Sequence, residues 1–361
     1  MIVATSGVIA AGGGIAELVS LSLSGFILFR RCGTTVAESC AYGLITTLMS
    51  LSLVFQSAFL FHLPAASLVI EAIVTTLALA FIVHRRSDLR PALTSVKSLW
   101  SRHPLMCSVI MIAWGYLVLL ALVIPPGTIY WQSIARVLEF ESHQPLFPTG
   151  VSTLTGGNQG LPASANILIL PHLFLRFHGD VGLGLLGIAA YLSVGFSVYA
   201  LSRRYAWPST AFTVAVIVLS MPRMVYLATA PGYEIIPTAV ALFCLLAVFR
   251  TVESPNARDL YLLLLGLVFM ISKATLQLTF PLVLVPLAGL LLFRRHGMMT
   301  WWHLVAARPS ILLLFSIPAL IFSPLLPLVH RLVSNGSSDG ARILSTMVYN
   351  NDGLQGTAAN T

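Results

Sequence analysis

Long apolar runs recur along the whole 361-residue chain, and they limit the possible folds more than any other feature. A helix needs about 17–25 apolar residues to cross the hydrocarbon core of a bilayer. Runs close to that length lie at 8–29, 38–61, 66–84, 104–124, 181–201, 207–227, 232–249, 276–293 and 309–330. They do not alternate between apolar and polar residues as the strands of a membrane barrel do. The sequence therefore predicts an all-α membrane protein.

The charge content supports this class and narrows the choice of partner. Only 9% of the residues are charged and 57% are hydrophobic, whereas soluble domains have about 25% charged residues. The net charge of +8 could suggest nucleic acid, but the basic residues lie at the ends of the apolar runs. Membrane proteins place such residues on the cytoplasmic side. We expect membrane lipid, and no nucleic acid, as a partner.

Two shorter apolar stretches, 161–177 and 259–272, decide the number of spans. Basic residues favour the cytoplasmic side, so their distribution distinguishes between the two choices. If 259–272 crosses and 161–177 does not, five basic groups fall on one side: Arg30 with Arg31, the 85–102 segment, Arg203 with Arg204, Arg250 with Arg258, and Arg294 with Arg295 and Arg308. We therefore predict about ten transmembrane helices, with both termini exoplasmic.

This topology leaves 125–180 as one long exoplasmic loop. An apolar face from Ile129 to Leu138 is typical of a helix that lies on the membrane surface. Pro162 and Pro171 make 161–177 better suited to an interfacial or re-entrant helix than to a span. The expected parts are accessory N-terminal transmembrane helices at 1–103, a core at 104–330 that includes the loop, and a polar exoplasmic tail at 331–361 where the chain could be truncated.

One lysine interrupts the apolar stretch from Leu260 to Phe293. This lysine, Lys273, falls in an outer turn of a predicted span, as do Arg223 and Glu234 in neighbouring spans. Two interpretations remain open. Lys273 snorkels to the lipid headgroups, or it shares a water-accessible pocket with the other two side chains.

Two further acidic residues lie within predicted spans. Glu17 is near the middle of the first span, and Glu71 is in the outer third of the third span. Ionisable residues inside a membrane are candidates for function. The alternative is that both are buried, protonated hydrogen-bond donors that hold the N-terminal helices to the rest of the bundle.

Three stretches follow one another in an order typical of a known family. PPGTIYWQSIARVLEF (125–140) comes directly after the 104–124 span. LPASANILILPHLFLRFHGD, YALSRRYAW and SMPRMVYLATAPGYEIIPTAVALF then lead to Glu234, and MISKATLQLTFPLVL contains Lys273. Over about 104–330 the chain resembles the polytopic membrane glycosyltransferases of the C-type fold, which include protein-mannosyltransferase-like and aminoarabinose-transferase-like enzymes.

The resemblance implies roles for individual residues. Lys273 matches the lysine of the family, and Glu234 matches its second acidic position. When the loops are aligned on Arg136, the aspartate that serves the family as catalytic base or metal partner falls at Thr128. Either another acidic residue of the loop replaces it, or the protein does not catalyse transfer.

The implied reaction is transfer of a sugar from a polyprenyl-phosphate donor to an acceptor on the exoplasmic side of a bacterial inner membrane. Cations stabilise the phosphate as charge develops on it, and a carboxylate deprotonates the acceptor hydroxyl. The expected site contains Lys273, Arg223 and Arg136 for the phosphate, Glu234, Glu139 and Glu141 for catalysis, and His172, Thr128 and Tyr130 along the loop and cavity.

Other functions are compatible with the same residues. A divalent cation would fit between the carboxylates and the phosphate, although no tight ligand spacing predicts a metal site. The protein could instead be a transporter or lipid flippase that uses Glu17 and Glu71. It could also be a catalytically inactive subunit of a membrane complex, with partner subunits that the sequence does not identify.

Overall fold

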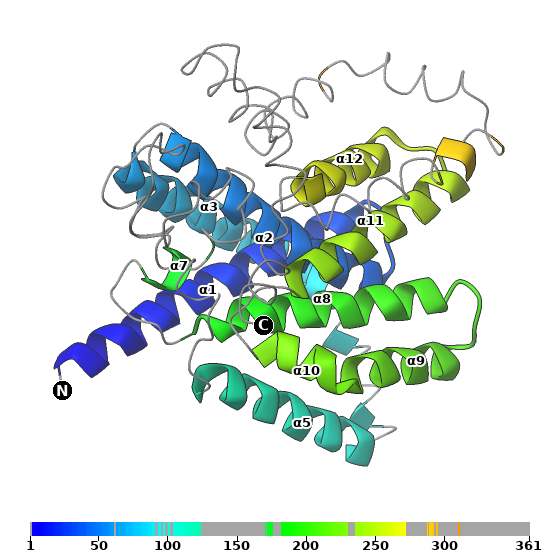
Figure 1. The fold of residues 1–361 in the computed structure, drawn as a ribbon, viewed down its shortest axis with the longest axis horizontal. Coiled ribbons are helices and arrows are strands. Elements are labelled where there is room, and N and C mark those ends of the chain that lie inside the picture. Colours follow the sequence, from blue (N-terminus) through cyan, green and yellow to red (C-terminus); the bar gives the residue numbers. More distant parts are fainter. Residues whose placement is uncertain are drawn as a thin grey trace, which may run out of the picture. The chain divides into compact units, whose positions relative to one another are not determined.

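A computed structural model describes residues 2–60, 63–90, 93–94, 97, 100–101, 104–123, 170, 172–175, 182–229, 235–271, 287, 289–291, 294 and 310. Every regular element in these ranges is a helix (Figure 1). The helices are α1 (Ile2–Arg31), α2 (Val36–Leu60), α3 (Pro64–His84), the short 3-10 helix η1 (Arg86–Leu89), α5 (Pro104–Val123), α7 (His172–Leu175), α8 (Gly184–Ser202), α9 (Pro208–Ser220), α10 (Pro222–Thr229), α11 (Ile235–Glu253) and α12 (Ala257–Ile271).

Five of the described helices are long and apolar enough to cross a membrane. They correspond to Gly12–Arg31, Val36–Ala58, Ala65–His84, Gly184–Ser202 and Ile235–Glu253. The α9–α10 pair forms a sixth if the two helices count as one bent span, and α5 contains a shorter apolar segment. The prediction of an all-α membrane protein is thus confirmed over these residues. The predicted spans 276–293 and 309–330 lie, apart from a few isolated positions, outside the described residues.

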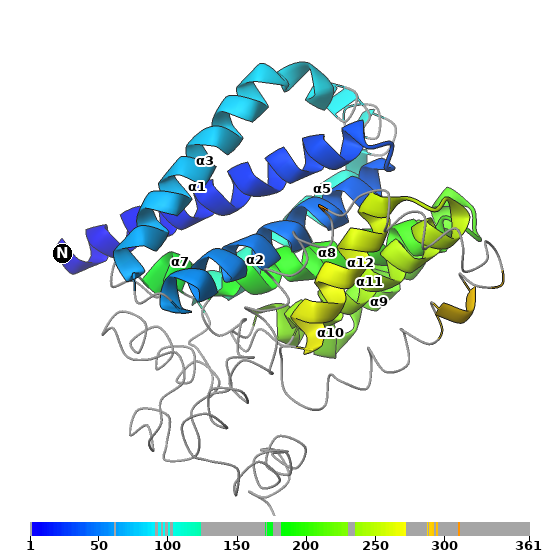
Figure 2. The ribbon, with the colours of Figure 1, turned by 90° about the horizontal axis from the view of Figure 1, so that it is seen from above.

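The chain forms two compact units. Unit 1 comprises Met1–His143 and Ile167–Leu246, and unit 2 comprises Gln144–Asn166 and Ala247–Thr361. In unit 1, α2 packs between α1 on one side and α8 on the other (Figure 2). Helix α3 packs against both α1 and α2.

Helices α1 and α2 approach each other closely because glycine occurs at the same level in both. A methyl group on Gly43 would lie 2.7 Å from the backbone oxygen of Ser22 and 2.8 Å from the nitrogen of Phe26. On the other helix, a methyl group on Gly25 would lie 3.0 Å from Cα of Gly43. Small residues allow such contact between membrane helices, where packing rather than a hydrophobic driving force holds them together.

The N-terminus of α2 is defined by a capping box. The backbone nitrogen of Thr35 donates to the Glu38 carboxylate at 3.0 Å, and the nitrogen of Glu38 donates to the Thr35 hydroxyl at 3.3 Å. This reciprocal pair satisfies two backbone donors at the start of the helix. The Glu38 carboxylate also accepts from Arg204, at the C-terminal end of α8, at 2.8 Å.

Two arginines of unit 1, Arg31 and Arg204, lie at the same end of its helices. Arg31 at the end of α1 lies 3.9 Å from Asp88 in η1, which directly follows α3. Arg204 contacts Glu38 in the first turn of α2, and α2 begins only a few residues after Arg31. At its other end, α8 begins beside the C-terminal end of α5, where a methyl group on Gly184 would clash with the Ala121 oxygen. The chain therefore leaves α5 and enters α8 at the end remote from these arginines.

The predicted span 207–227 is not one straight helix. Helices α9 and α10 meet at an angle of 65°. Met221, between them, has φ −59° and ψ 129°, and Pro222 follows. Proline disfavours the helical conformation in the preceding residue and provides no N–H for a helical hydrogen bond. The bend is thus a local consequence of Pro222.

In unit 2, α12 begins at a polar cluster. The Asn256 side chain accepts from the backbone nitrogen of Arg258 at 2.9 Å, which caps the helix. The carboxylate of Asp259 is 1% exposed and lies 3.5 Å from Nε of Arg250 and 3.3 Å from Nε of Arg258. The C-terminal part of α11, from Ala247 on, belongs to unit 2. These contacts join it to the start of α12.

Candidate functional site

Most of the residues that the sequence assigns to sugar transfer lie outside the described residues. These are Glu234, Glu139, Glu141, Lys273, Arg136, Thr128 and Tyr130. Arg223 and His172 are described, and they lie on separate helices, α10 and α7. Whether the predicted pocket of Arg223, Glu234 and Lys273 forms stays a prediction.

Arg223 lies directly after the bend between α9 and α10. Its side chain is exposed, and its guanidinium carbon lies 5.5 Å from the centre of the Tyr226 ring, one helical turn away. Helix α10 packs against α8, where the Ala228 oxygen would lie 2.5 Å from a methyl group on Gly187. This close contact orients α10 with Arg223 and Tyr226 exposed and Ala228 buried.

His172 is the first residue of α7 and is buried. Its ring meets the ring of Phe55 edge to face, with centroids 5.1 Å apart. Its neighbours Leu173 and Phe174 are fully buried, and Phe174 occupies the space beside Gly14 of α1. The short helix α7 is thus packed into unit 1 through His172, Leu173 and Phe174.

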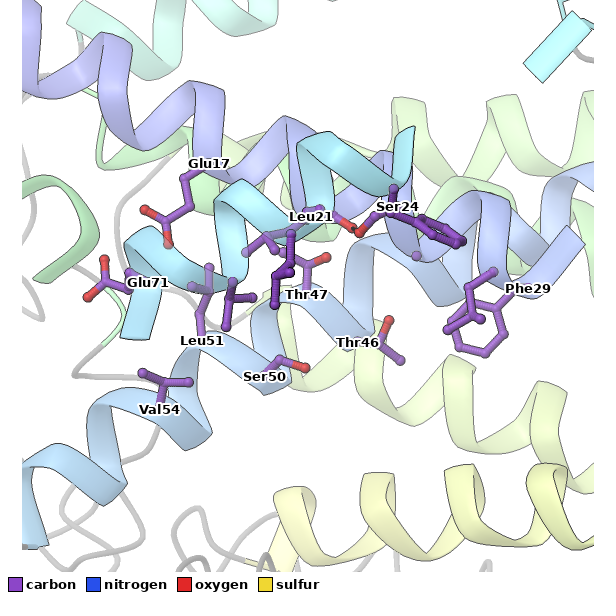
Figure 3. Close-up of a pocket in the computed structure, with 16 residues that line it drawn as sticks. Glu17, Leu21, Ser24, Phe29, Thr46, Thr47, Ser50, Leu51, Val54 and Glu71 are labelled. Atoms are coloured by element: carbon purple, nitrogen blue, oxygen red, sulfur yellow. Dashed lines mark hydrogen bonds between the residues drawn. The ribbon is translucent and has the colours of Figure 1, made fainter. Parts of the chain in front are cut away.

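The described part of unit 1 contains a groove between α1, α2 and α3, with a volume of about 500 Å³. Figure 3 shows Glu17 and Glu71 near one end of it, contributed by α1 and α3. Both carboxylic side chains are buried, with exposed fractions of 5% and 3%. The remaining lining residues are Leu21, Ser24, Gly25, Leu28, Phe29, Thr46, Thr47, Ser50, Leu51, Val54, Val74, Leu77, Ala78 and Phe81.

Two of the hydroxyl groups that line this groove donate to the backbone of their own helices. Ser24 donates to the oxygen of Leu21 at 2.8 Å, and Thr47 donates to the oxygen of Gly43 at 2.8 Å. A hydroxyl that donates to its own helix still has lone pairs that can accept a hydrogen bond. These hydroxyls therefore offer acceptors to anything that enters the groove.

No protein-family model matches this chain, and no curated protein or solved structure is significantly similar to it. In the described structure, the two acidic residues that the sequence singled out inside spans share one groove. The sequence identified both residues individually but contained no signal that they line the same groove.

Proposed function

We propose that this protein is an integral membrane glycosyltransferase-like protein. It transfers a sugar from a polyprenyl-phosphate donor to an acceptor on the exoplasmic side, at a bacterial inner membrane. The proposal rests on the order and spacing of the stretches that contain Arg136, Glu234 and Lys273. The structural observation that supports it best is an exposed arginine, Arg223, directly after a break in an apolar helix.

The break matters because irregular backbone at membrane depth is tolerated only inside the protein or beside a cavity. Broken helices of this kind form substrate sites in other membrane proteins. A guanidinium is planar and always charged, and it binds phosphate through paired N–H donors. Arg223 thus has the chemistry and the exposure to bind the phosphate of a lipid-linked donor.

In this proposal Lys273 and Arg136 assist Arg223 in stabilising charge on the leaving phosphate. Glu234, with Glu139 or Glu141, deprotonates the acceptor hydroxyl or orients it. The long 125–180 loop covers the site and excludes water. A divalent cation bound between carboxylates and phosphate is compatible with this set of residues.

The ten-span topology, with both termini exoplasmic, is part of the same proposal. Two contacts in unit 1 support it. Arg31 and Arg204 lie at one end of the helices, as expected if both are cytoplasmic. Ala121 and Gly184 are adjacent at the other end, so the loop that connects them can begin and end on the same side of the membrane.

Purified full-length protein in proteoliposomes, supplied with polyprenyl-phosphate sugars, tests the proposal. Lys273→Ala and Glu234→Gln should each reduce transfer by about a hundredfold or more, because each removes a group needed in the transition state. Lys97→Ala, which changes the only other lysine, and Glu253→Gln are the matched controls and should transfer normally. Unchanged transfer in the first two variants would refute these roles, and no transfer by native protein with any donor would favour an inactive subunit.

Transport is a second candidate, and one observation favours it. Glu17 and Glu71 lie in one groove between membrane-spanning helices, and paired acidic residues of this kind carry coupling ions in transporters. Sealed vesicles that contain the native protein should then take up the transported substrate. Vesicles that contain Glu17→Gln or Glu71→Gln protein should not, while sugar transfer remains unaffected. Normal uptake in both variants would exclude this function.

A further inference from the structure

We propose that the turn between α8 and α9 binds the head group of a phospholipid whose phosphate gives it one net negative charge. This turn, residues 203–207, connects two apolar helices of unit 1 at the end where Arg31 also lies (Figure 1). The inference goes beyond sugar transfer and transport and requires neither. It rests on a hollow in the turn, the position of one arginine, the local charge and two exposed aromatic rings.

The turn forms a shallow hollow of about 400 Å³. The hollow is lined by Arg203, Arg204, Tyr205, Ala206, Trp207 and Pro208. Backbone hydrogen bonds hold the turn in shape, since the nitrogens of Tyr205 and Ala206 donate to the oxygen of Ser202 at 3.1 Å and 2.9 Å. Pro208 then begins α9 and fixes the backbone where the turn ends. A turn that is already ordered loses little conformational entropy when a ligand binds.

Arg203 has the geometry to bind a phosphate. Its side chain is exposed, and its Nη1 donates to the oxygen of Ala206 at 2.7 Å. This hydrogen bond holds the guanidinium against the turn. A guanidinium has five N–H donors in a fixed fork, so a bond through Nη1 leaves the edge formed by Nε and Nη2. The paired N–H groups of that edge match two oxygens of one phosphate.

The charge of the hollow complements a head group with one negative charge. Arg204 also lines the hollow, but its Nη2 donates to the Glu38 carboxylate at 2.8 Å. Glu38 therefore balances the charge of Arg204, and Arg203 gives the turn its net positive charge. None of the described lining residues is acidic. A phosphodiester with no other charged group complements this hollow, whereas a zwitterionic head group would bring a second cation close to Arg203.

Two aromatic rings place the turn at the level of the lipid head groups. Tyr205 and Trp207 are 76% and 81% exposed. Tyrosine and tryptophan are enriched at the membrane–water interface, because each has an apolar ring and a polar group. Helix α8 is long and apolar enough to cross a membrane and ends at Ser202, directly before Arg203. The hollow therefore lies where the phosphates of one lipid leaflet are found.

Other anions fit this turn less well. A single exposed ion pair contributes little in water, so free phosphate would occupy the hollow weakly. The acyl chains of a lipid hold its head group beside the turn, which raises its effective concentration there. An acidic segment of another protein would complement the charge, but it would not explain why two aromatic rings are exposed at the end of an apolar helix.

Radiolabelled phosphatidylglycerol, whose head group has one negative charge, is a direct probe. Full-length protein in a non-ionic detergent should bind it saturably. Unlabelled phosphatidylglycerol should displace the probe. Phosphatidylcholine with the same acyl chains should not, and neither should glycerophosphoglycerol, which is the same head group without acyl chains. Arg203→Ala should weaken binding about fivefold, as expected for one ion pair at an interface. Arg203→Lys should restore part of the affinity, because it keeps the charge but loses the fork.

Two matched controls separate this site from general attraction to charge or to apolar surface. Arg86→Ala removes an exposed arginine of η1, at the same end of unit 1, and should bind normally. Trp207→Ala should weaken binding, whereas Trp114→Ala, which removes a 39% exposed tryptophan of α5, should not. Raising the salt concentration from about 0.1 M to about 1 M shortens the screening length from about 10 Å to about 3 Å. Native protein should then lose affinity, and Arg203→Ala should lose less.

Several results would overturn the inference. These are native affinity in Arg203→Ala, an equal loss in Arg86→Ala, and equal displacement by phosphatidylcholine. Displacement by glycerophosphoglycerol as effective as that by the lipid would overturn it in favour of a site for free phosphate. Displacement by polyglutamate at lower concentrations than the lipid would overturn it in favour of an acidic protein partner. None of these measurements depends on sugar transfer.

Discussion

The Arg204 guanidinium donates to the Glu38 carboxylate at 2.8 Å, and this contact joins the turn that follows α8 to the first turn of α2. The two residues are far apart in the sequence. Their side chains are only 13% and 5% exposed. Glu38 is thus both the acidic member of the capping box and the partner of an arginine from another helix.

Replacement of this arginine should destabilise unit 1. Arg204→Ala leaves a buried carboxylate without its guanidinium and should lower the free energy of unfolding by about 3 kcal/mol. Thermal unfolding of the detergent-solubilised protein measures the change. Arg203→Ala is the matched control, because Arg203 is exposed and its guanidinium donates to the oxygen of the nearby Ala206 rather than to a carboxylate of the described residues. Equal effects of the two substitutions would show that the buried ion pair stabilises the protein no more than an exposed arginine does.

Close packing of α1 on α2 predicts a position that does not tolerate a methyl group. Gly43→Ala would place Cβ 2.7 Å from the Ser22 oxygen, so the helices must separate, at a cost of about 1–3 kcal/mol. Gly115→Ala in α5 is the comparison, since in the described part of the chain no heavy atom from beyond its own stretch of helix lies within 4 Å of its added methyl group. Urea titration of both variants measures the difference, and similar midpoints would contradict the packing described here.

The bend at Pro222 predicts a measurable distance. Spin labels at the exposed positions Ser209 and Tyr226 report on the angle between α9 and α10. Pro222→Ala restores the missing N–H and should straighten the pair, so the label separation increases towards about 26 Å along a continuous helix. Pro208→Ala, at the first position of α9, should not change it. An unchanged separation in Pro222→Ala would mean that tertiary packing, and not the proline, imposes the bend.

The polar cluster of unit 2 can be tested separately. Asp259→Asn removes the charge that Arg250 and Arg258 share and should destabilise the start of α12 by about 1–3 kcal/mol. Hydrogen exchange should show this as faster exchange of the α12 amides. Glu253→Gln changes an exposed carboxylate of α11 and should exchange like native protein. Uniform acceleration across both units would argue against a local role.

Several features of the fold could be predicted from local sequence alone. The membrane-spanning helices follow from the length of the apolar runs, since a helix is the simplest way to satisfy backbone groups inside a bilayer. Thr35 and Glu38 have the spacing of a capping box and mark the start of α2. The break in the 207–227 span was missed, although Pro222 was a visible signal for it.

The candidate groove could not be predicted in the same way. Periodicity shows that Glu17 and Glu71 lie in helices, but not how each helix is rotated about its axis relative to its neighbours. That rotation depends on packing, here on the close approach at Gly25 and Gly43 and on the position of α3 against α1. With an unchanged hydropathy pattern, either acidic residue could have faced a different neighbouring helix.

The sequence by itself determined that this chain is a helical membrane protein and where most of its described helices begin and end, because the bilayer and the local backbone impose those limits on any chain of this composition. Only the tertiary structure decided that two acidic residues from different helices share one groove, and that Arg204 reaches Glu38. Such contacts depend on how the packed helices are positioned and rotated relative to one another. That arrangement results from packing between distant parts of the chain, and no local stretch of sequence determines it.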